Sequence, residues 1–151
     1  RSSCRTMRLP VKYGFPIYGH AHITAGAREL DAGTKIRHWD TSITSVDAWR
    51  ALHEIDRVAF IKVDVEGFEP QVILGATETI DRDRPSLLLE IEDRHLARYG
   101  MTANGFVDSI LDRWPEYTMY LWRDEEWVTT DRVELGIRNY LFATDAAITR
   151  D

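Results

Sequence analysis

Two short apolar runs separated by one amphipathic stretch dominate the pattern of hydrophobic and polar positions along this chain. Residues 58–65 and 86–91 are rich in Val, Ile, Leu and Phe, and acidic residues stand where each run ends. Both runs are shorter than an ordinary helix, so we expect two β-strands. The second run is apolar at successive positions, which indicates burial on both faces, as in a parallel sheet.

A short helix is expected before the first of these strands. Thr44 or Ser45 can cap a helix that begins at Val46, because their side-chain oxygens can accept hydrogen bonds from free backbone N–H groups. The spacing of Val46, Trp49 and Leu52 would place these three side chains on one buried face.

Two further helices follow the strands. One is expected to begin near residues 69–70, where an acid and a proline suit the first turn of a helix. Its apolar stripe consists of Val72, Ile73, Ala76 and Ile80. The other is expected over residues 102–114, with an apolar side made of Phe106, Val107, Ile110, Leu111 and Trp114. The order strand, helix, strand, helix predicts two βαβ-like units with right-handed crossovers.

The two ends of the chain are less regular. Residues 1–40 contain scattered Pro and Gly, so we expect irregular structure there with short strands near residues 7–11, 21–24 and 36–39. Late strands are expected over residues 117–122 and 139–144, and a polar segment without a helical pattern separates them. The fold class predicted is therefore α/β, with a mainly parallel sheet and an antiparallel final strand pair.

Composition narrows the class of protein. The chain has 151 residues and a net charge of -6, which suggests one domain and disfavours a general nucleic-acid-binding surface. Its single cysteine, Cys4, cannot form an internal disulfide, so we expect a cytoplasmic location. No apolar run approaches the roughly 20 residues that span a bilayer. Because the first residue is Arg1, we expect the chain to begin inside a longer product or a broken reading frame.

Acidic residues mark the ends of both central strands. Asp64 and Glu66 end the first, and Glu90 ends the second; ligands of open α/β sheets bind beyond such carboxyl ends. In an extended strand Asp64 and Glu66 would point to the same face. Neighbouring carboxylates there can share a proton, or hold a cation or a ligand's amine or hydroxyl. The alternative is plain solvated charge, and Lys62 could pair with either acid of the first strand.

The residues around these acids resemble the signature of the FkbM-type family of S-adenosylmethionine-dependent methyltransferases. That signature is close to I-K-[IV]-D-[VI]-E-G-x-E, and residues 61–69 read I-K-V-D-V-E-G-F-E. A V-L-x-G-A element follows in the family, and residues 72–76 read V-I-L-G-A. A proline-led strand ending in L-E matches residues 85–90, and an upstream T-x-L-D element matches T-S-V-D at residues 44–47. The similarity spans roughly residues 41–91.

The resemblance implies a Rossmann-like class I methyltransferase sheet, with residues 1–151 as a partial, C-terminal half-domain and its αβ units over residues 41–145. It implies that Asp64, Glu66 and Glu90 are catalytic and orient or deprotonate an acceptor hydroxyl. It also implies that Asp64 and Gly67 lie beside the cofactor, S-adenosyl-L-methionine. The expected reaction is O-methylation of a sugar, a glycolipid or a secondary metabolite.

One family element is missing. A D-x-G-A-N-x-G loop, whose glycines let the backbone approach the cofactor, does not occur in this chain, so we expect weak cofactor binding. The alternative function is a non-catalytic half-domain remnant that acts as an interaction module. A half sheet would also expose a strand edge, so we expect self-association. A nucleotide-binding domain of another class is a third possibility, but the sequence lacks a phosphate-binding loop.

Other candidate residues carry less weight. His20 and His22 could bind a metal if His95 supplied a third ligand, but their spacing favours ordinary surface or core histidines, so no metal site is assigned. Aromatic residues gather near the C-terminus, namely Trp114, Tyr117, Tyr120, Trp122 and Trp127. They could form a sugar- or base-stacking platform, but packing within the fold explains them better.

Overall fold

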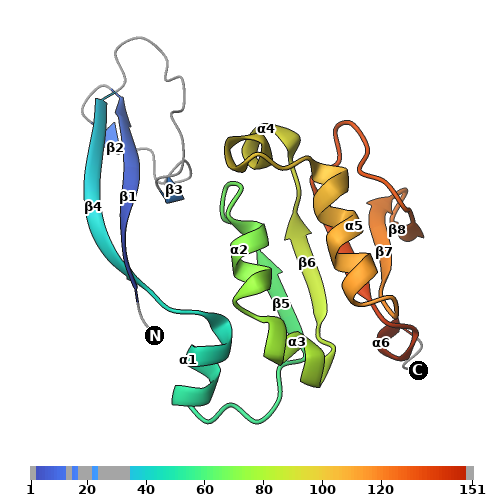
Figure 1. Ribbon diagram of the computed structural model, residues 1–151. Coiled ribbons are helices and arrows are strands. Elements are labelled where there is room, and N and C mark those ends of the chain that lie inside the picture. The colour runs from blue at the N-terminus through green and yellow to red at the C-terminus, as the bar shows by residue number, and fades with distance from the viewer. Residues whose placement is uncertain (1–2, 13–14, 17–21, 24–34, 149–151) are drawn as a thin grey trace.

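The computed structural model describes residues 3–12, 15–16, 22–23 and 35–148, which form two separate sheets (Figure 1). The first sheet contains β1 (Ser3–Lys12), β2 (Phe15–Pro16), β3 (His22–Ile23) and β4 (Lys35–Ile43). In this sheet β1 pairs antiparallel with each of the other three strands. The short strands expected near residues 7–11 and 36–39 are thus parts of two long strands.

The second sheet has five strands in the order β5-β6-β9-β7-β8. Their bounds are β5 (Phe60–Val63), β6 (Ser86–Glu90), β7 (Thr118–Arg123), β8 (Glu126–Thr129) and β9 (Asn139–Ala143). β5 and β6 are adjacent and parallel, and β7 and β9 are antiparallel, as predicted. The remaining pairings are also antiparallel, so the sheet is mixed and matches the prediction of a mainly parallel sheet only in part. The sequence did not reveal β8, because all its residues are exposed and no apolar pattern marks it.

The helices are α1 (Val46–Leu52), α2 (Glu69–Leu74), α3 (Thr77–Asp83), α4 (Asp93–Leu96), α5 (Ala103–Arg113) and α6 (Asp145–Ile148), with a 3₁₀ turn, η2, at Ala97–Tyr99. Ser45 caps α1 and Thr102 caps α5 through their side-chain oxygens. These two helix starts agree with the sequence pattern. Within the described residues, no helix is both long enough and apolar enough to cross a bilayer.

α1 does not bury the apolar face that its spacing predicted. Trp49 is 49% exposed and Leu52 is 77% exposed. Val46 packs against the core, and a polar contact anchors the helix as well: the buried Arg50 pairs with Asp83 at the end of α3 at 3.4 Å, and it donates to the carbonyl oxygens of Ile55 and Asp56 in the segment after α1. The ion pair between Arg50 and Asp83 therefore links α1 to α3, while Trp49 and Leu52 stay exposed.

The segment expected as one helix from residues 69–70 is broken into α2 and α3. The break follows Gly75, where an added Cβ atom would lie 3.2 Å from Cβ of Ser45. The backbone N–H of Asp47 also donates to the carbonyl oxygen of Gly75 at 3.0 Å. Close approach of α1 to this point explains both the glycine and the interruption of the helix.

The core lies between one face of the five-stranded sheet and the helices α3 and α5 (Figure 1). Alternate residues of the strands are buried, which identifies the covered face: Leu87, Leu89, Met119, Leu121, Tyr140 and Phe142. Leu88, between two of them, is only half-buried. The described residues therefore cover one face of β6 fully, and the expectation of burial on both faces is wrong.

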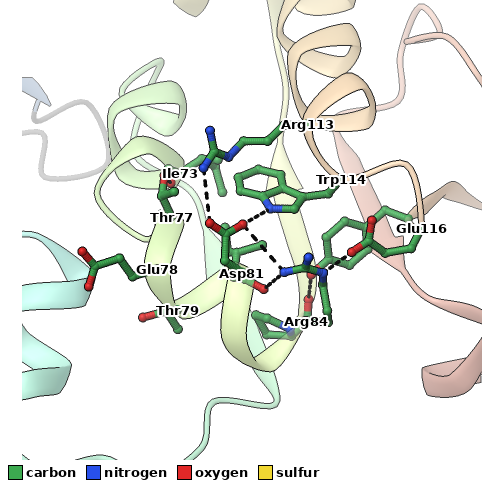
Figure 2. Close-up of polar contacts among 12 residues, drawn as sticks. Ile73, Thr77, Glu78, Thr79, Asp81, Arg84, Arg113, Trp114 and Glu116 are labelled. Carbon is green, nitrogen blue, oxygen red and sulfur yellow. Dashed lines mark hydrogen bonds and ion pairs between the residues drawn. The ribbon is translucent and has the colours of Figure 1, made fainter.

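A polar cluster ties the end of α3 to the end of α5 (Figure 2). The Asp81 carboxylate accepts a hydrogen bond from the indole N–H of Trp114 at 2.6 Å and pairs with Arg113 at 3.3 Å. Arg84 pairs with Asp81 at 3.7 Å and also with Glu116. The indole hydrogen bond and the neighbouring guanidinium groups lower the pKa of Asp81. This cluster holds the two helices in register over the core.

Asp47, the acid of the T-S-V-D element, is a cap for a helix other than its own. One of its carboxylate oxygens accepts from the backbone N–H and the hydroxyl of Thr79 at 2.9 and 2.6 Å. The other accepts from the backbone N–H of Glu78 at 3.1 Å. These donors belong to the first turn of α3, whose N–H groups have no partner within the helix. Asp47 therefore fastens α1 to α3.

We predict that Asp47→Ala lowers the free energy of unfolding by about 1–2 kcal/mol, the usual cost of losing a helix cap. Urea titration followed by circular dichroism measures it. Asp112→Ala, at an exposed acid of α5, is the matched control and should change the value by less than about 0.5 kcal/mol. Equal effects of the two variants would contradict the capping role.

Candidate functional site

Parallel pairing brings the ends of β5 and β6 together. Val63 lies opposite Leu89, so the next residues along each strand, Asp64 and Glu90, are also neighbours. Their carboxyl groups lie close enough for each to shift the pKa of the other. β5 ends at Val63, two residues earlier than predicted. Asp64 thus follows the strand directly, whereas Glu66 lies in a turn rather than on an extended strand.

The turn after β5 is shaped by two residues with positive φ angles. Glu66 has φ +55° and Gly67 has φ +100°, a region that residues with a Cβ atom seldom adopt. A buried carboxylate holds this backbone: one oxygen of Glu69 accepts from the N–H groups of Val65 and Gly67 at 3.0 and 3.2 Å. Glu69 is 2% exposed, and burial raises the pKa of its carboxyl group. The second acid of the E-G-F-E motif therefore supports the first.

Gly67 is required by close packing. A Cβ atom added there would lie 2.6 Å from the carbonyl oxygen of His95 and 2.7 Å from its carbonyl carbon. The turn thus presses against the backbone of α4. Any larger residue would push α4 away from the end of β5. Whether Gly67 also lies beside the cofactor, as expected, stays a prediction.

The same packing places His95 beside two of the acids. Its Nε2 atom lies 3.1 Å from a carboxylate oxygen of Glu66, and the imidazole side chain is 4% exposed. One ligand atom from each of Glu66, Glu90 and His95 lies within 4.8 Å of the other two. Arg98 donates to the backbone carbonyl oxygen of Glu66 at 3.3 Å. We call Asp64, Glu66, Glu90 and His95 the strand-end cluster.

The charges of the strand-end cluster are uneven. Lys62 pairs with Asp64 at 3.0 Å and lowers the pKa of that carboxyl group. The pKa of Glu90 is raised to about 7 by burial and by the nearby carboxylates, Asp64 first among them. Burial lowers the pKa of His95. Near neutral pH the cluster therefore combines an ionised Asp64, a partly protonated Glu90 and a neutral imidazole.

The structure brings the three predicted catalytic residues, Asp64, Glu66 and Glu90, to one place. Sequence reasoning missed the part played by Glu69, for which the E-G-x-E spacing was the available signal. It named His95 only as a possible metal ligand beside His20 and His22, and not as a partner of these acids. His20 and the side chain of His22 lie outside the described residues, so their suggested partnership with His95 stays open.

The C-terminal aromatic residues divide into two groups. Trp114 and Tyr117 are buried in the core, as packing predicted. Trp122 and Trp127 lie opposite each other on the β7–β8 hairpin, with ring centroids 5.1 Å apart, and both are about half exposed. Packing within the fold therefore accounts fully for Trp114 and Tyr117, but only in part for Trp122 and Trp127.

A cavity of about 460 Å³ lies elsewhere, between α1 and α3. Its lining includes Asp47, Arg50 and Thr79, which are already engaged in the contacts that join these helices. None of the strand-end cluster lines it. The cavity therefore belongs to the attachment of α1, and the cluster is the better candidate for chemistry.

Comparison with protein families agrees with the resemblance seen in the sequence. The model of the methyltransferase FkbM domain matches residues 12–120. No curated protein and no solved structure matches the chain. The match covers the strand-end cluster as well as β4, β5, β6 and α5.

We predict that Glu90→Gln raises stability at alkaline pH. The raised pKa of Glu90 means that the folded chain binds this proton more tightly than the unfolded chain, so stability falls as pH rises from the ordinary carboxyl pKa through about 7. Relative to wild type, the variant should gain about 1–2 kcal/mol between pH 5 and pH 8, since partial exposure reduces the full linkage value.

Thermal melts at the two pH values measure this gain. Glu126→Gln, at an exposed acid of β8, is the control and should follow the wild type at both pH values. A Glu90→Gln variant whose stability stays parallel to wild type from pH 5 to pH 8 would show that Glu90 is an ordinary solvated acid.

Proposed function

Because the chain belongs to the FkbM methyltransferase family, we propose that it acts in the S-adenosylmethionine-dependent O-methylation of a hydroxyl on a sugar, a glycolipid or a secondary metabolite. The observation that carries this proposal is the convergence of Asp64, Glu66 and Glu90 at the carboxyl ends of two parallel strands. Ligands of α/β sheets bind at such ends. In this proposal the five-stranded sheet is the C-terminal half of a Rossmann-like methyltransferase sheet.

The cluster suits the handling of an acceptor hydroxyl. A hydroxyl oxygen becomes a better nucleophile as it loses its proton, and a carboxylate within hydrogen-bond reach can receive that proton. Asp64 is exposed and ionised, and Lys62 holds its side chain from one side. Glu66 is 21% exposed and is held by His95. We assign these two acids to orienting the hydroxyl and accepting its proton, with Glu90 behind them.

The described residues do not fit the cofactor as well as they fit an acceptor. S-adenosyl-L-methionine supplies the methyl group when bound. However, the backbone N–H of Gly67 already donates to Glu69, and the backbone of His95 fills the space beside the Cα atom of Gly67. The glycine loop of the family is also missing from the sequence. We therefore propose that this chain contributes the acceptor side of the site, with Asp64 nearest the cofactor.

A non-catalytic role as an interaction module is the second candidate. β5 forms one edge of its sheet, and among the described residues it pairs only with β6. An unpaired edge can recruit another strand, including one from a second copy. The single cysteine supports a reducing, cytoplasmic setting for either function.

We predict that the 151-residue chain binds S-adenosyl-L-methionine weakly, because its described residues offer no glycine-lined cradle. Calorimetric titration of the chain with the cofactor tests this. A micromolar dissociation constant, equivalent to about -8 kcal/mol, would show that the cofactor is held by residues other than those expected.

We predict that Asp64→Asn and Glu66→Gln each lower the turnover of the complete enzyme by roughly 10²–10⁴-fold, the usual contribution of a general base. Both changes remove charge while nearly preserving shape. Methyl transfer from labelled cofactor to a panel of sugars, glycolipids and polyketide-type alcohols measures turnover, with melting temperatures recorded beside it.

Asp47→Asn is the control, because Asp47 acts on the helix α3 and not in the cluster. Near-normal turnover in both cluster variants would remove the catalytic assignment. No turnover by the wild-type protein with any acceptor would favour the interaction module.

A further inference from the structure

Three groups of the strand-end cluster have the chemistry and spacing of metal ligands. Nε2 of His95 and a carboxylate oxygen of Glu66 lie 3.1 Å apart, and a carboxylate oxygen of Glu90 lies within 4.8 Å of both. Ligand atoms bound at 2.0–2.2 Å to one ion lie roughly 3–4 Å apart. Small rotations of the Glu90 side chain would complete such an arrangement.

The surroundings favour an ion at this place over a loose group of acids. The neighbouring acids already have cationic partners: Asp64 pairs with Lys62, and Glu92 pairs with Arg94 at 2.6 Å and Arg138 at 3.5 Å. Glu66 pairs with the imidazole of His95, and a carboxylate oxygen of Glu90 lies within 4.8 Å of both ligand atoms. Arg98 donates a hydrogen bond to the backbone carbonyl oxygen of Glu66 at 3.3 Å.

The third ligand is held firmly, as a metal site requires. His95 has a side chain that is 96% buried, and its backbone is fixed by contact with Gly67. The φ angle of +55° at Glu66 aims that side chain toward the imidazole, and Glu69 maintains the turn. A strained residue that persists because its surroundings hold it is common at functional sites.

We propose that Glu66, Glu90 and His95 form a binding site for one divalent transition-metal ion. One imidazole and two carboxylates suit Mn²⁺, Fe²⁺ or Zn²⁺ better than Mg²⁺ or Ca²⁺, which prefer oxygen ligands alone. Three protein ligands leave open positions for water or for an acceptor oxygen. The use of these positions by an acceptor rests on the proposed function, but binding of the ion does not.

Titration of the chelator-treated 151-residue chain with Mn²⁺, followed by electron paramagnetic resonance of the free ion, tests the proposal. We expect one Mn²⁺ per chain, with Zn²⁺ competing for it and Mg²⁺ competing poorly. Glu66→Gln and Glu90→Gln should each raise the dissociation constant by at least about 10-fold. Circular dichroism confirms that both variants remain folded.

Glu92→Gln is the matched control, because this nearby acid is engaged by Arg94 and Arg138. It should leave the dissociation constant within about threefold of wild type, whereas an equal loss in all three variants would indicate diffuse attraction to negative charge. That result, or the absence of Mn²⁺ binding by the wild-type chain, would overturn the metal site. Neither outcome bears on methyl transfer, which has its own test.

Discussion

The buried carboxylate of Glu69 is the interaction on which the rest of the site depends. By accepting hydrogen bonds from the N–H groups of Val65 and Gly67, it closes the turn that ends β5. That turn sets the positive φ angle of Glu66 and brings Gly67 against His95. Without it, Asp64 and Glu90 would still meet through strand pairing, but Glu66 and His95 would not join them.

The strand-end cluster stores unfavourable electrostatic free energy within a stable scaffold. Burial and neighbouring carboxylates raise the pKa of Glu90, so ionising this group near neutral pH opposes folding. The core of α3, α5 and the sheet supplies the opposing stability, and the caps and ion pairs of Asp47 and Asp81 fasten its helices. Carboxyl groups whose pKa values are shifted by burial and by neighbouring charges are characteristic of functional sites.

Local patterns predicted the parts of the fold that depend on local physics. Apolar runs identified β5 and β6, and Ser45 caps α1 as its position suggested. Tertiary contacts decided what the patterns could not show. The close approach of Ser45 to Gly75 divides α2 from α3, and Arg50 links α1 to Asp83 of α3 while Leu52 stays exposed. Antiparallel pairing of β9 with β6 made the sheet mixed.

The sequence predicted the acidic residues of the candidate site, because they belong to a recognisable motif. It did not predict the residue that only tertiary packing brings to them. Asp64 and Glu90 stand at strand ends in the sequence, so their meeting followed from parallel pairing, whereas the turn held by Glu69 brings Glu66 to them. His95 is distant from the signature along the chain, and the sequence suggested it only as a possible partner of His20 and His22. Only the packing of α4 against Gly67 shows that it belongs with the acids.

The most direct test of the gathered carboxylates is a ¹³C nuclear magnetic resonance titration of their side-chain carbons in the metal-free chain. The account predicts that Glu90 titrates near pH 7, that Asp64 titrates below its ordinary range, and that Asp64→Asn moves the Glu90 midpoint downward. Ordinary midpoints for both groups in the wild-type chain would contradict it, because they would mean that the strand-end acids stand apart in solution.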